Sequence, residues 1–243
     1  MDATQRTIEV AFSPRFLPLF EPEGKLIVVA DILRATTVIT TMLMNGAKEV
    51  IPVPDLESAR SYKEKGFTVA AERNGSRLDF ADFGNSPFLF TPETVGGKSI
   101  VYSTTNGTNA IHMAARGSQV LIGAFLNLTA VADHIKHHRE DVLILCAGWK
   151  GKFCLEDAVY AGALSQLLLR DPQFRTDCDS VKASLDFWQL AQSNLLGYID
   201  KVAQRTRLGK LGLDDVIGYC HEIDKTATLP VLDENHLVNI NKK

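Results

Sequence analysis

Two segments of this sequence place an acid and an arginine close together at the end of a short apolar run. Asp31 and Arg34 follow the run at residues 26–30, and Glu72 and Arg73 follow a second such run. A carboxylate binds a hard metal ion through oxygen, whereas a guanidinium donates two parallel hydrogen bonds to a phosphate or carboxylate. Together these groups suit an anionic ligand bridged by a metal. A structural alternative is open, because Asp31 can cap the following helix and pair with Arg34.

A polar segment, Thr104-Thr105-Asn106-Gly107, also follows an apolar run and precedes a helical pattern. Backbone N–H groups and hydroxyls at a helix start can surround a phosphate, and the helix dipole adds to the attraction. The alternative is a plain helix cap, for which Ser, Thr and Asn are preferred. Two threonines, an asparagine and a glycine exceed what one cap requires. We therefore expect Thr104, Thr105, Asn106 and Gly107 to bind substrate.

Glu156 and Asp157 form an adjacent pair of acids at the start of another helical pattern, after a glycine-rich turn. Acids are favourable at a helix start through the dipole alone. Because neighbouring helical residues point about 100° apart, one acid can stabilise the helix start while the other faces a metal. We assign Asp157 to the metal. Cys146, at the end of the preceding apolar run, is expected to be structural, since no histidine lies close in sequence to act as its base.

The elements that must position these groups alternate between strands and helices, as judged from apolar runs and helical periods. The expected strands are residues 7–12, 26–30, 49–53, 68–71, 98–103, 120–125, 142–146 and 229–240. The expected helices are residues 36–44, 56–65, 106–116, 128–138, 155–170, 181–205 and 214–221. The alternation predicts a layered α/β/α fold with a mostly parallel or mixed sheet and catalytic groups at strand carboxyl ends. Pro230 favours an edge position for the last strand.

Two proline-rich segments fall outside this alternation. Residues 13–24 are expected to form an extended connector. Residues 73–92 contain Asn-Gly, Gly-Asn and two prolines, which predicts an irregular excursion. Ordered loops of this length tend to be functional. Asn85 and Ser86 in this loop can reach a ligand, although turn formation alone explains them.

Length and composition fit one α/β domain spanning residues 1–243, with a subdomain split near residue 125 left open. The chain is 45% hydrophobic and 23% charged, with 26 basic and 29 acidic residues. These values are ordinary for a soluble protein and give no reason to expect a nucleic-acid partner. No stretch approaches the roughly 20 apolar residues of a membrane helix, and no signal-like segment opens the sequence, so a cytoplasmic protein is expected. Its four cysteines lack C-x-x-C spacing and are expected to be reduced thiols. Homo-oligomerisation is left open.

The chain resembles the 2-phosphosulfolactate phosphatase family in blocks that occur in family order: DILRATT at 31–37, ERNG at 72–75, GNSP at 84–87, TTNGT at 104–108, and CAG with ED at 146–157. The resemblance runs from about residue 7 to the last expected strand. It implies an α/β enzyme that hydrolyses 2-phosphosulfolactate to sulfolactate and phosphate with Mg²⁺, a step of coenzyme M biosynthesis. The bulky Trp149 and the two lysines of residues 148–153 leave a related phosphorylated acid open as substrate.

The resemblance and the residue chemistry together give each group a role. Mg²⁺ uses one or two carboxylates directly, and the candidates are Asp31, Glu72, Glu156 and Asp157. Arg34 and the polar segment at residues 104–107 would stabilise charge in the transition state. Arg73 would meet the sulfonate or carboxylate of the substrate.

Two other functions remain open. Asp31 can serve as the covalent nucleophile of a phosphatase acting on another substrate, although Leu33 replaces the second acid of the D-x-D-x-T pattern found in haloacid-dehalogenase phosphatases. A non-catalytic protein can bind a phosphorylated metabolite with the same groups. Phosphate release from a phosphorylated acid distinguishes an enzyme from a binding protein.

Overall fold

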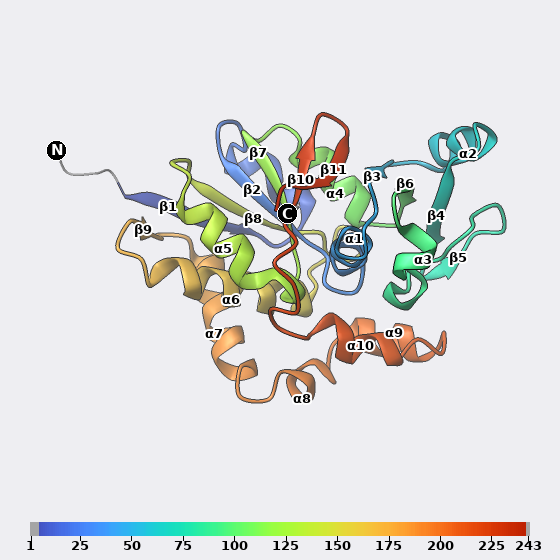
Figure 1. Ribbon diagram of the computed structural model, residues 1–243. Helices are drawn as coiled ribbons and strands as arrows, with labels where there is room; N and C mark the ends of the chain where they lie inside the picture. Colours follow the sequence, from blue (N-terminus) through green and yellow to red (C-terminus); the bar gives the residue numbers. More distant parts are fainter. Residues whose placement is uncertain (1–4, 242–243) are drawn as a thin grey trace.

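Short apolar runs of the sequence form the strands of one 11-stranded mixed sheet (Figure 1). The computed structural model describes residues 5–241. Its strands are β1 (Arg6–Ala11), β2 (Leu26–Ala30), β3 (Glu49–Pro52), β4 (Thr68–Arg73), β5 (Ser76–Arg77), β6 (Ser99–Ser103), β7 (Gln119–Gly123), β8 (Val142–Cys146), β9 (Phe174–Arg175), β10 (Pro230–Asp233) and β11 (His236–Asn239). The strand order is β5-β4-β6-β3-β11-β10-β7-β2-β8-β1-β9. The predicted α/β class is confirmed.

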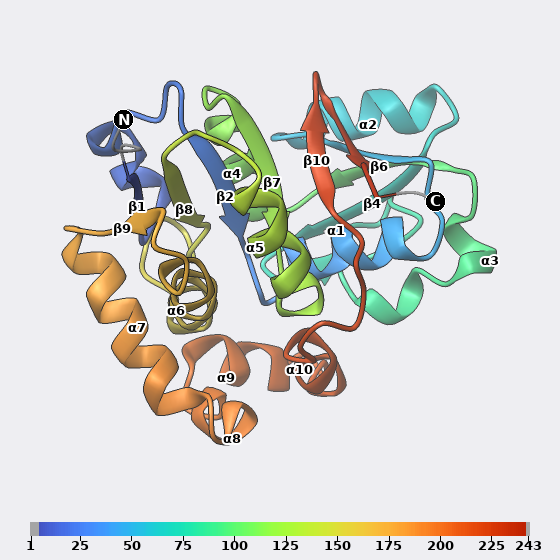
Figure 2. The same ribbon diagram turned by 60° about the vertical axis from the view of Figure 1, so that its left-hand side comes forward.

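Helices cover both faces of the sheet (Figure 2). The α-helices are α1 (Ala35–Met44), α2 (Leu56–Glu64), α3 (Pro92–Val95), α4 (Gly107–Ala114), α5 (Leu128–Lys136), α6 (Leu155–Leu169), α7 (Asp179–Ala191), α8 (Leu195–Ile199), α9 (Ala203–Gly209) and α10 (Asp215–Cys220). Short 3₁₀ helices are η1 (Pro14–Phe20), η2 (Pro87–Leu89) and η3 (Phe125–Asn127).

Strand β2 is buried on both faces, as its uninterrupted apolar run predicts. Val28 packs with side chains of α5, α6 and α7 on one face. Ile27 and Val29 pack with α1 and α4 on the opposite face. A further apolar cluster packs α8, α9 and α10 against Leu33, the residue before Arg34. The C-terminal helices are therefore anchored to the segment that follows β2.

The sheet consists of two groups of parallel strands that run in opposite directions. The first group is β9, β1, β8, β2 and β7, and the second is β3, β6 and β4. The hairpin of β10 and β11 joins them through antiparallel pairing with β7 on one side and β3 on the other. Each junction is one residue pair, Val231 with Leu121 and Leu237 with Val50. Such short junctions allow the sheet to bend, and the carboxyl ends of both groups reach one cavity.

The prediction of one edge strand at residues 229–240 is wrong. The chain reverses at Glu234, which has a φ of 50°, so the segment forms two strands. Both lie inside the sheet, between β7 and β3. Pro230 is tolerated there because β10 pairs with β7 at Val231, so the missing N–H of the proline removes no bond from that junction.

The expected extended connector at residues 13–24 is also wrong, because most of it forms η1. The Ser13 hydroxyl accepts the Arg15 N–H at 3.4 Å. Pro14 occupies the first helical position, where its fixed φ is favourable and its missing N–H costs nothing. Leu17 is buried and holds this turn against the core.

The single helix expected over residues 181–205 is interrupted. α7 ends at Ala191, and the Asn194 side chain accepts the Gly197 N–H at 3.0 Å to start α8. Asparagine is favoured at such a start because its oxygen satisfies an otherwise unpaired N–H. The chain therefore turns into α8 and then α9, which brings α9 to the carboxyl ends of the strands (Figure 2).

The four cysteines are free thiols. Within residues 5–241 no helix combines the length and the apolar character needed to cross a bilayer. The single domain and the split left open near residue 125 stay predictions.

Candidate active site

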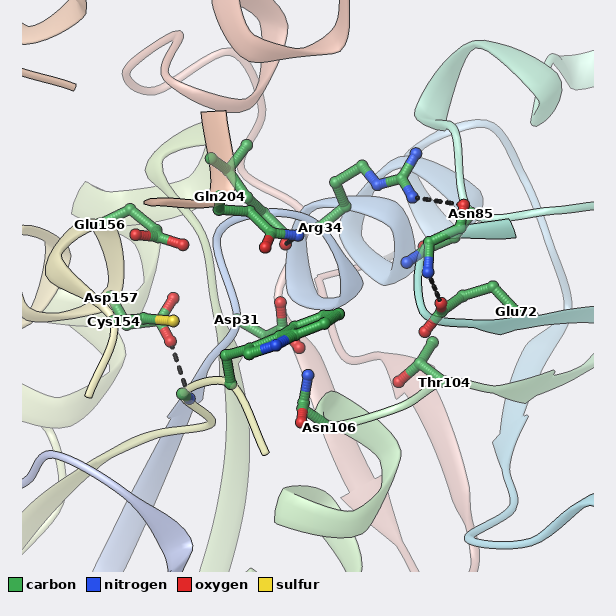
Figure 3. A pocket seen from close by; sticks show the side chains of 14 residues that line it. Asp31, Arg34, Glu72, Asn85, Thr104, Asn106, Cys154, Glu156, Asp157 and Gln204 are labelled. Atoms are coloured by element: carbon green, nitrogen blue, oxygen red, sulfur yellow. Dashed lines mark hydrogen bonds between the residues drawn. The ribbon is translucent and has the colours of Figure 1, made fainter. Parts of the chain in front are cut away.

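A polar cavity lies where the carboxyl ends of the two strand groups meet (Figure 3). Its side chains surround about 390 Å³ of empty space, part of which is open solvent. The predicted residues that line it are Asp31, Arg34, Glu72, Asn85, Thr104, Asn106, Glu156 and Asp157. The structure thus brings together residues from opposite halves of the sheet.

Asp31 follows β2 and is buried at the centre of this cavity. Its Oδ1 accepts the Ala35 N–H at 3.2 Å, so Asp31 also stabilises the start of α1, as the structural alternative expected. Burial raises the pKa of the Asp31 carboxyl to about 7. The neighbouring acids Glu72 and Glu156 add to this rise, whereas Arg34 opposes it. This carboxyl therefore holds a proton more readily than an ordinary aspartate does.

Asp157 connects two loops through its carboxylate. Oδ1 accepts the Ile32 N–H at 2.9 Å, and Oδ2 accepts the Gly148 N–H at 3.0 Å. Burial raises the pKa of the Asp157 carboxyl well above its usual range, and the charges of Glu156 and Asp31 raise it further. Three acids at close quarters thus disfavour one another's ionised forms, and a cation would relieve this repulsion.

Glu156 lies beside Asp157 in the first turn of α6 and points toward the cavity (Figure 3). Burial raises the pKa of its carboxyl. Arg207 and a hydrogen bond with Cys154 oppose that rise. Its neighbours are therefore a thiol and a guanidinium.

Glu72 ties the end of β4 to the segment after β6. Its Oε2 accepts the Gly75 N–H and its Oε1 accepts the Thr105 N–H, each at 2.6 Å. Asn74 and Gly75 have φ values of 54° and 89°, which form the tight turn between β4 and β5. Arg34 reaches the same turn, because its Nη2 donates to the Gly75 carbonyl at 3.3 Å. Arg34 is held by this carbonyl.

The polar segment before α4 stabilises the first turn of that helix and also lines the cavity. Thr104 and Thr108 exchange hydrogen bonds, each backbone N–H donating to the other hydroxyl at 3.1 Å. Asn106 accepts the Lys150 N–H at 2.8 Å. A Cβ on Gly107 would lie 2.8 Å from Asp31 Oδ2. The cap alternative is therefore part of the structure, and it places Thr104 and Asn106 on the cavity.

Four predicted substrate-binding residues do not line the cavity: Arg73, Ser86, Thr105 and Gly107. Arg73 donates to the Glu72 carbonyl at 2.6 Å and to Ser103 Oγ at 3.0 Å. Ser86 starts η2. Their roles as direct substrate contacts stay predictions.

Sequence reasoning missed several lining residues: Leu33, Gly75, Gly148, Trp149, Cys154 and Gln204. In the sequence, Gly148 and Trp149 were notable only as part of an unusual turn. Their closeness in sequence to Glu156 was the feature that could have indicated a place in the site. Gln204 gave none, because it comes from α9, far along the chain, and reaches the cavity only after the helix break at Asn194. Its Nε2 donates to the Leu33 carbonyl at 3.3 Å.

The fold and the cavity define an α/β protein in which two groups of parallel strands bring buried acids and an arginine together at their carboxyl ends. The chain belongs to the 2-phosphosulpholactate phosphatase family, whose model matches residues 12–235. The predicted family, and with it the class of phosphoric monoester hydrolases, is confirmed.

Relatives match over most of their length and carry the name probable 2-phosphosulfolactate phosphatase. The protein of Caldanaerobacter subterraneus subsp. tengcongensis is 40% identical over 212 residues, which cover 86% of this chain and 88% of the relative. The Thermotoga maritima protein is 36% identical over 215 residues, 88% of this chain and 92% of the relative. The Gloeobacter violaceus protein is 36% identical over 228 residues, 92% of this chain and 94% of the relative.

Proposed function

We propose that this protein hydrolyses 2-phosphosulfolactate, or a closely related phosphorylated 2-hydroxy acid, to the free acid and phosphate, with Mg²⁺ as cofactor. The observation that carries the proposal is the position of buried Arg34 on the same cavity as Asp31, Glu156 and Asp157. A guanidinium binds phosphate bidentately, and a cation would relieve the repulsion among the neighbouring carboxylates. Family membership supports the choice of a phosphate monoester.

The donor set of the cavity fits Mg²⁺. Asp31, Glu72, Glu156 and Asp157 offer hard oxygen ligands. Across residues 5–241, no three His, Cys, Asp or Glu side chains are gathered into a ready-made metal cage. Mg²⁺ suits this arrangement, because it uses one or two carboxylates and completes its shell with water and phosphate oxygens. When bound, Mg²⁺ supplies positive charge that stabilises the transferring phosphate group.

The chain's own residues bind the phosphate and handle its proton. Arg34 is held by the Gly75 carbonyl, so its guanidinium is positioned before substrate arrives. Asp31 is assigned the proton of the attacking water, because its buried carboxyl has a raised pKa in the metal-free site. Asp157 keeps the loops after β2 and β8 together, which fixes the distance between the two strand ends.

Phosphate release from synthetic 2-phosphosulfolactate tests the proposal. We expect stoichiometric phosphate and sulfolactate with Mg²⁺, no turnover in excess chelator, and recovery when Mg²⁺ is added back. A folded protein that binds phosphorylated 2-hydroxy acids without releasing phosphate would instead be a binding protein. Acid quenching during turnover of ³²P-labelled substrate addresses the covalent alternative, because labelled protein would indicate a phosphoenzyme and a label mapped to Asp31 would make it the nucleophile.

We also propose that the protein is cytoplasmic, as its sequence indicates, and that it acts in coenzyme M biosynthesis, as the family resemblance implies. Homo-oligomerisation stays open.

A further inference from the structure

We propose that Arg207 binds the anionic group of the substrate that is not transferred, the sulfonate or carboxylate, and that Trp149 and Gln204 hold its guanidinium in place. The inference rests on the proposed function, because it names the residue that selects phosphorylated acids at the same site. The sequence analysis assigned this role to Arg73, which donates to Ser103 Oγ at 3.0 Å and does not line the cavity; that assignment stays a prediction.

Arg207 is held against the cavity by two residues that line it. Its guanidinium stacks on Trp149, with 4.5 Å between the guanidinium carbon and the ring centroid. Its Nε donates to Gln204 Oε1 at 2.5 Å. Gln204 in turn donates to the Leu33 carbonyl at 3.3 Å. Stacking and one hydrogen bond fix the plane of a side chain that would otherwise be flexible.

The remaining donors of Arg207 are available to a ligand. A guanidinium has five N–H donors, and only Nε is committed to Gln204. Among the described residues, the two Nη groups of Arg207 donate to no protein acceptor. Arg205, on the same helix, is different, because it pairs with Asp200 at 3.1 Å and with Asp214 at 3.0 Å. One arginine of α9 is therefore paired within the protein, whereas, within residues 5–241, the two Nη groups of the other are unpaired beside Trp149 and Gln204, two residues that line the cavity.

The charge distribution of the cavity explains why a second arginine is needed. Arg34 points toward Asn85 on one side, whereas Glu156 and Cys154 lie on the other side (Figure 3). An acid group of the substrate placed near Glu156 would meet another negative charge. Arg207 acts on Glu156 and Cys154 electrostatically, which puts its charge on that side. Two arginines at opposite sides thus suit a substrate with a phosphate at one end and an acid at the other.

Binding of the product acid isolates this contact from turnover. Titration calorimetry would measure the affinities of sulfolactate and of inorganic phosphate for four proteins. These are the wild type, Arg207→Gln, Arg207→Lys and the matched control Arg205→Gln. We expect Arg207→Gln to weaken sulfolactate binding by roughly tenfold or more, with phosphate changed less than about twofold. Arg207→Lys should recover part of the loss, because it keeps the charge without the planar fork. Arg205→Gln should leave both affinities unchanged.

A kinetic comparison provides a second readout with the same variants. For Arg207→Gln, KM for 2-phosphosulfolactate should rise by roughly tenfold or more, while glycerol phosphate, which lacks the acid groups, changes by less than about threefold. Equal losses for both esters, or sulfolactate binding that is absent in wild type or unchanged in Arg207→Gln, would overturn the inference. If wild type hydrolyses no ester, the proposed function fails, and the sulfolactate comparison still decides the role of Arg207.

Discussion

The Asp157 carboxylate accepts the backbone N–H of Ile32 at 2.9 Å, across 125 positions of sequence. Its second oxygen accepts the Gly148 N–H at 3.0 Å. One buried side chain therefore joins the segments that follow β2 and β8, the two strands that present Asp31 and the α6 acids. Asp157 therefore determines the shape of the cavity as well as contributing to the charge of the cavity.

Asp157→Asn is expected to reduce both stability and metal use. One of its two acceptor oxygens becomes an NH₂ group that faces a backbone N–H, at a cost of about 1–3 kcal/mol. Glu156→Gln should cost less, because the Glu156 carboxyl is hydrogen-bonded to its own backbone N–H and to Cys154 and not to two separate loops. Melting temperatures and rates against Mg²⁺ concentration would be measured for both variants. A wild-type Mg²⁺ profile in Asp157→Asn would remove Asp157 from the set of metal ligands.

Arg34→Lys is expected to lower kcat/KM by roughly tenfold or more, because an ammonium cannot reproduce a bidentate fork on phosphate. Arg73→Lys is the matched control, since Arg73 contacts Glu72 and Ser103 outside the cavity. It should have a smaller effect on kcat/KM. Steady-state kinetics with Mg²⁺ present would compare the two. Equal losses in both variants would contradict the assignment of Arg34 to the phosphate.

The titration of Asp31 predicts a pH-dependent stability of the metal-free protein. Its pKa rises from the ordinary 3.8 to about 7 in the folded state, so the folded protein binds the proton more tightly than the unfolded chain. Stability from this group is complete below about pH 3.8 and is lost as pH rises through about 7. Asp31→Asn should therefore melt at a higher temperature than wild type at about pH 8, and with little difference at about pH 4. Melting temperatures of both proteins, measured in chelator between about pH 4 and about pH 8, would test this prediction. A difference between the two proteins that stays constant with pH would refute it.

Gly107→Ala is expected to damage the site through steric overlap. The added Cβ would lie 2.4 Å from Ala35 Cβ and 2.8 Å from Asp31 Oδ2. Such overpacking costs about 1–3 kcal/mol, and displacement of Asp31 should lower kcat. Gly218→Ala in α10 is the control, because its Cβ meets no atom within 4 Å. That variant should gain about 0.5–1 kcal/mol of stability with unchanged activity.

Much of the fold follows from local pattern, because a covered parallel strand such as β2 must be apolar throughout. The acids at strand ends were visible for the same reason, since Asp31 and Glu72 interrupt such runs. The internal hairpin was not predictable, because Pro230 usually marks an edge, and it is tolerated here only since β10 pairs with β7 at Val231. Gln204 was hidden because its place depends on how α9 packs rather than on its own neighbours.

The hairpin of β10 and β11 also sets an order of assembly. All other strands of the sheet precede it in the sequence, so β3 and β7 present open hydrogen-bonding edges until the hairpin is made. Open edges invite pairing between chains. A nascent chain would pass through a state in which both groups of parallel strands have formed but are not yet joined. In that state Asp31, on one group, is not yet held in place relative to Glu72, on the other. A variant truncated before residue 229 should therefore aggregate during synthesis rather than remain an inactive monomer.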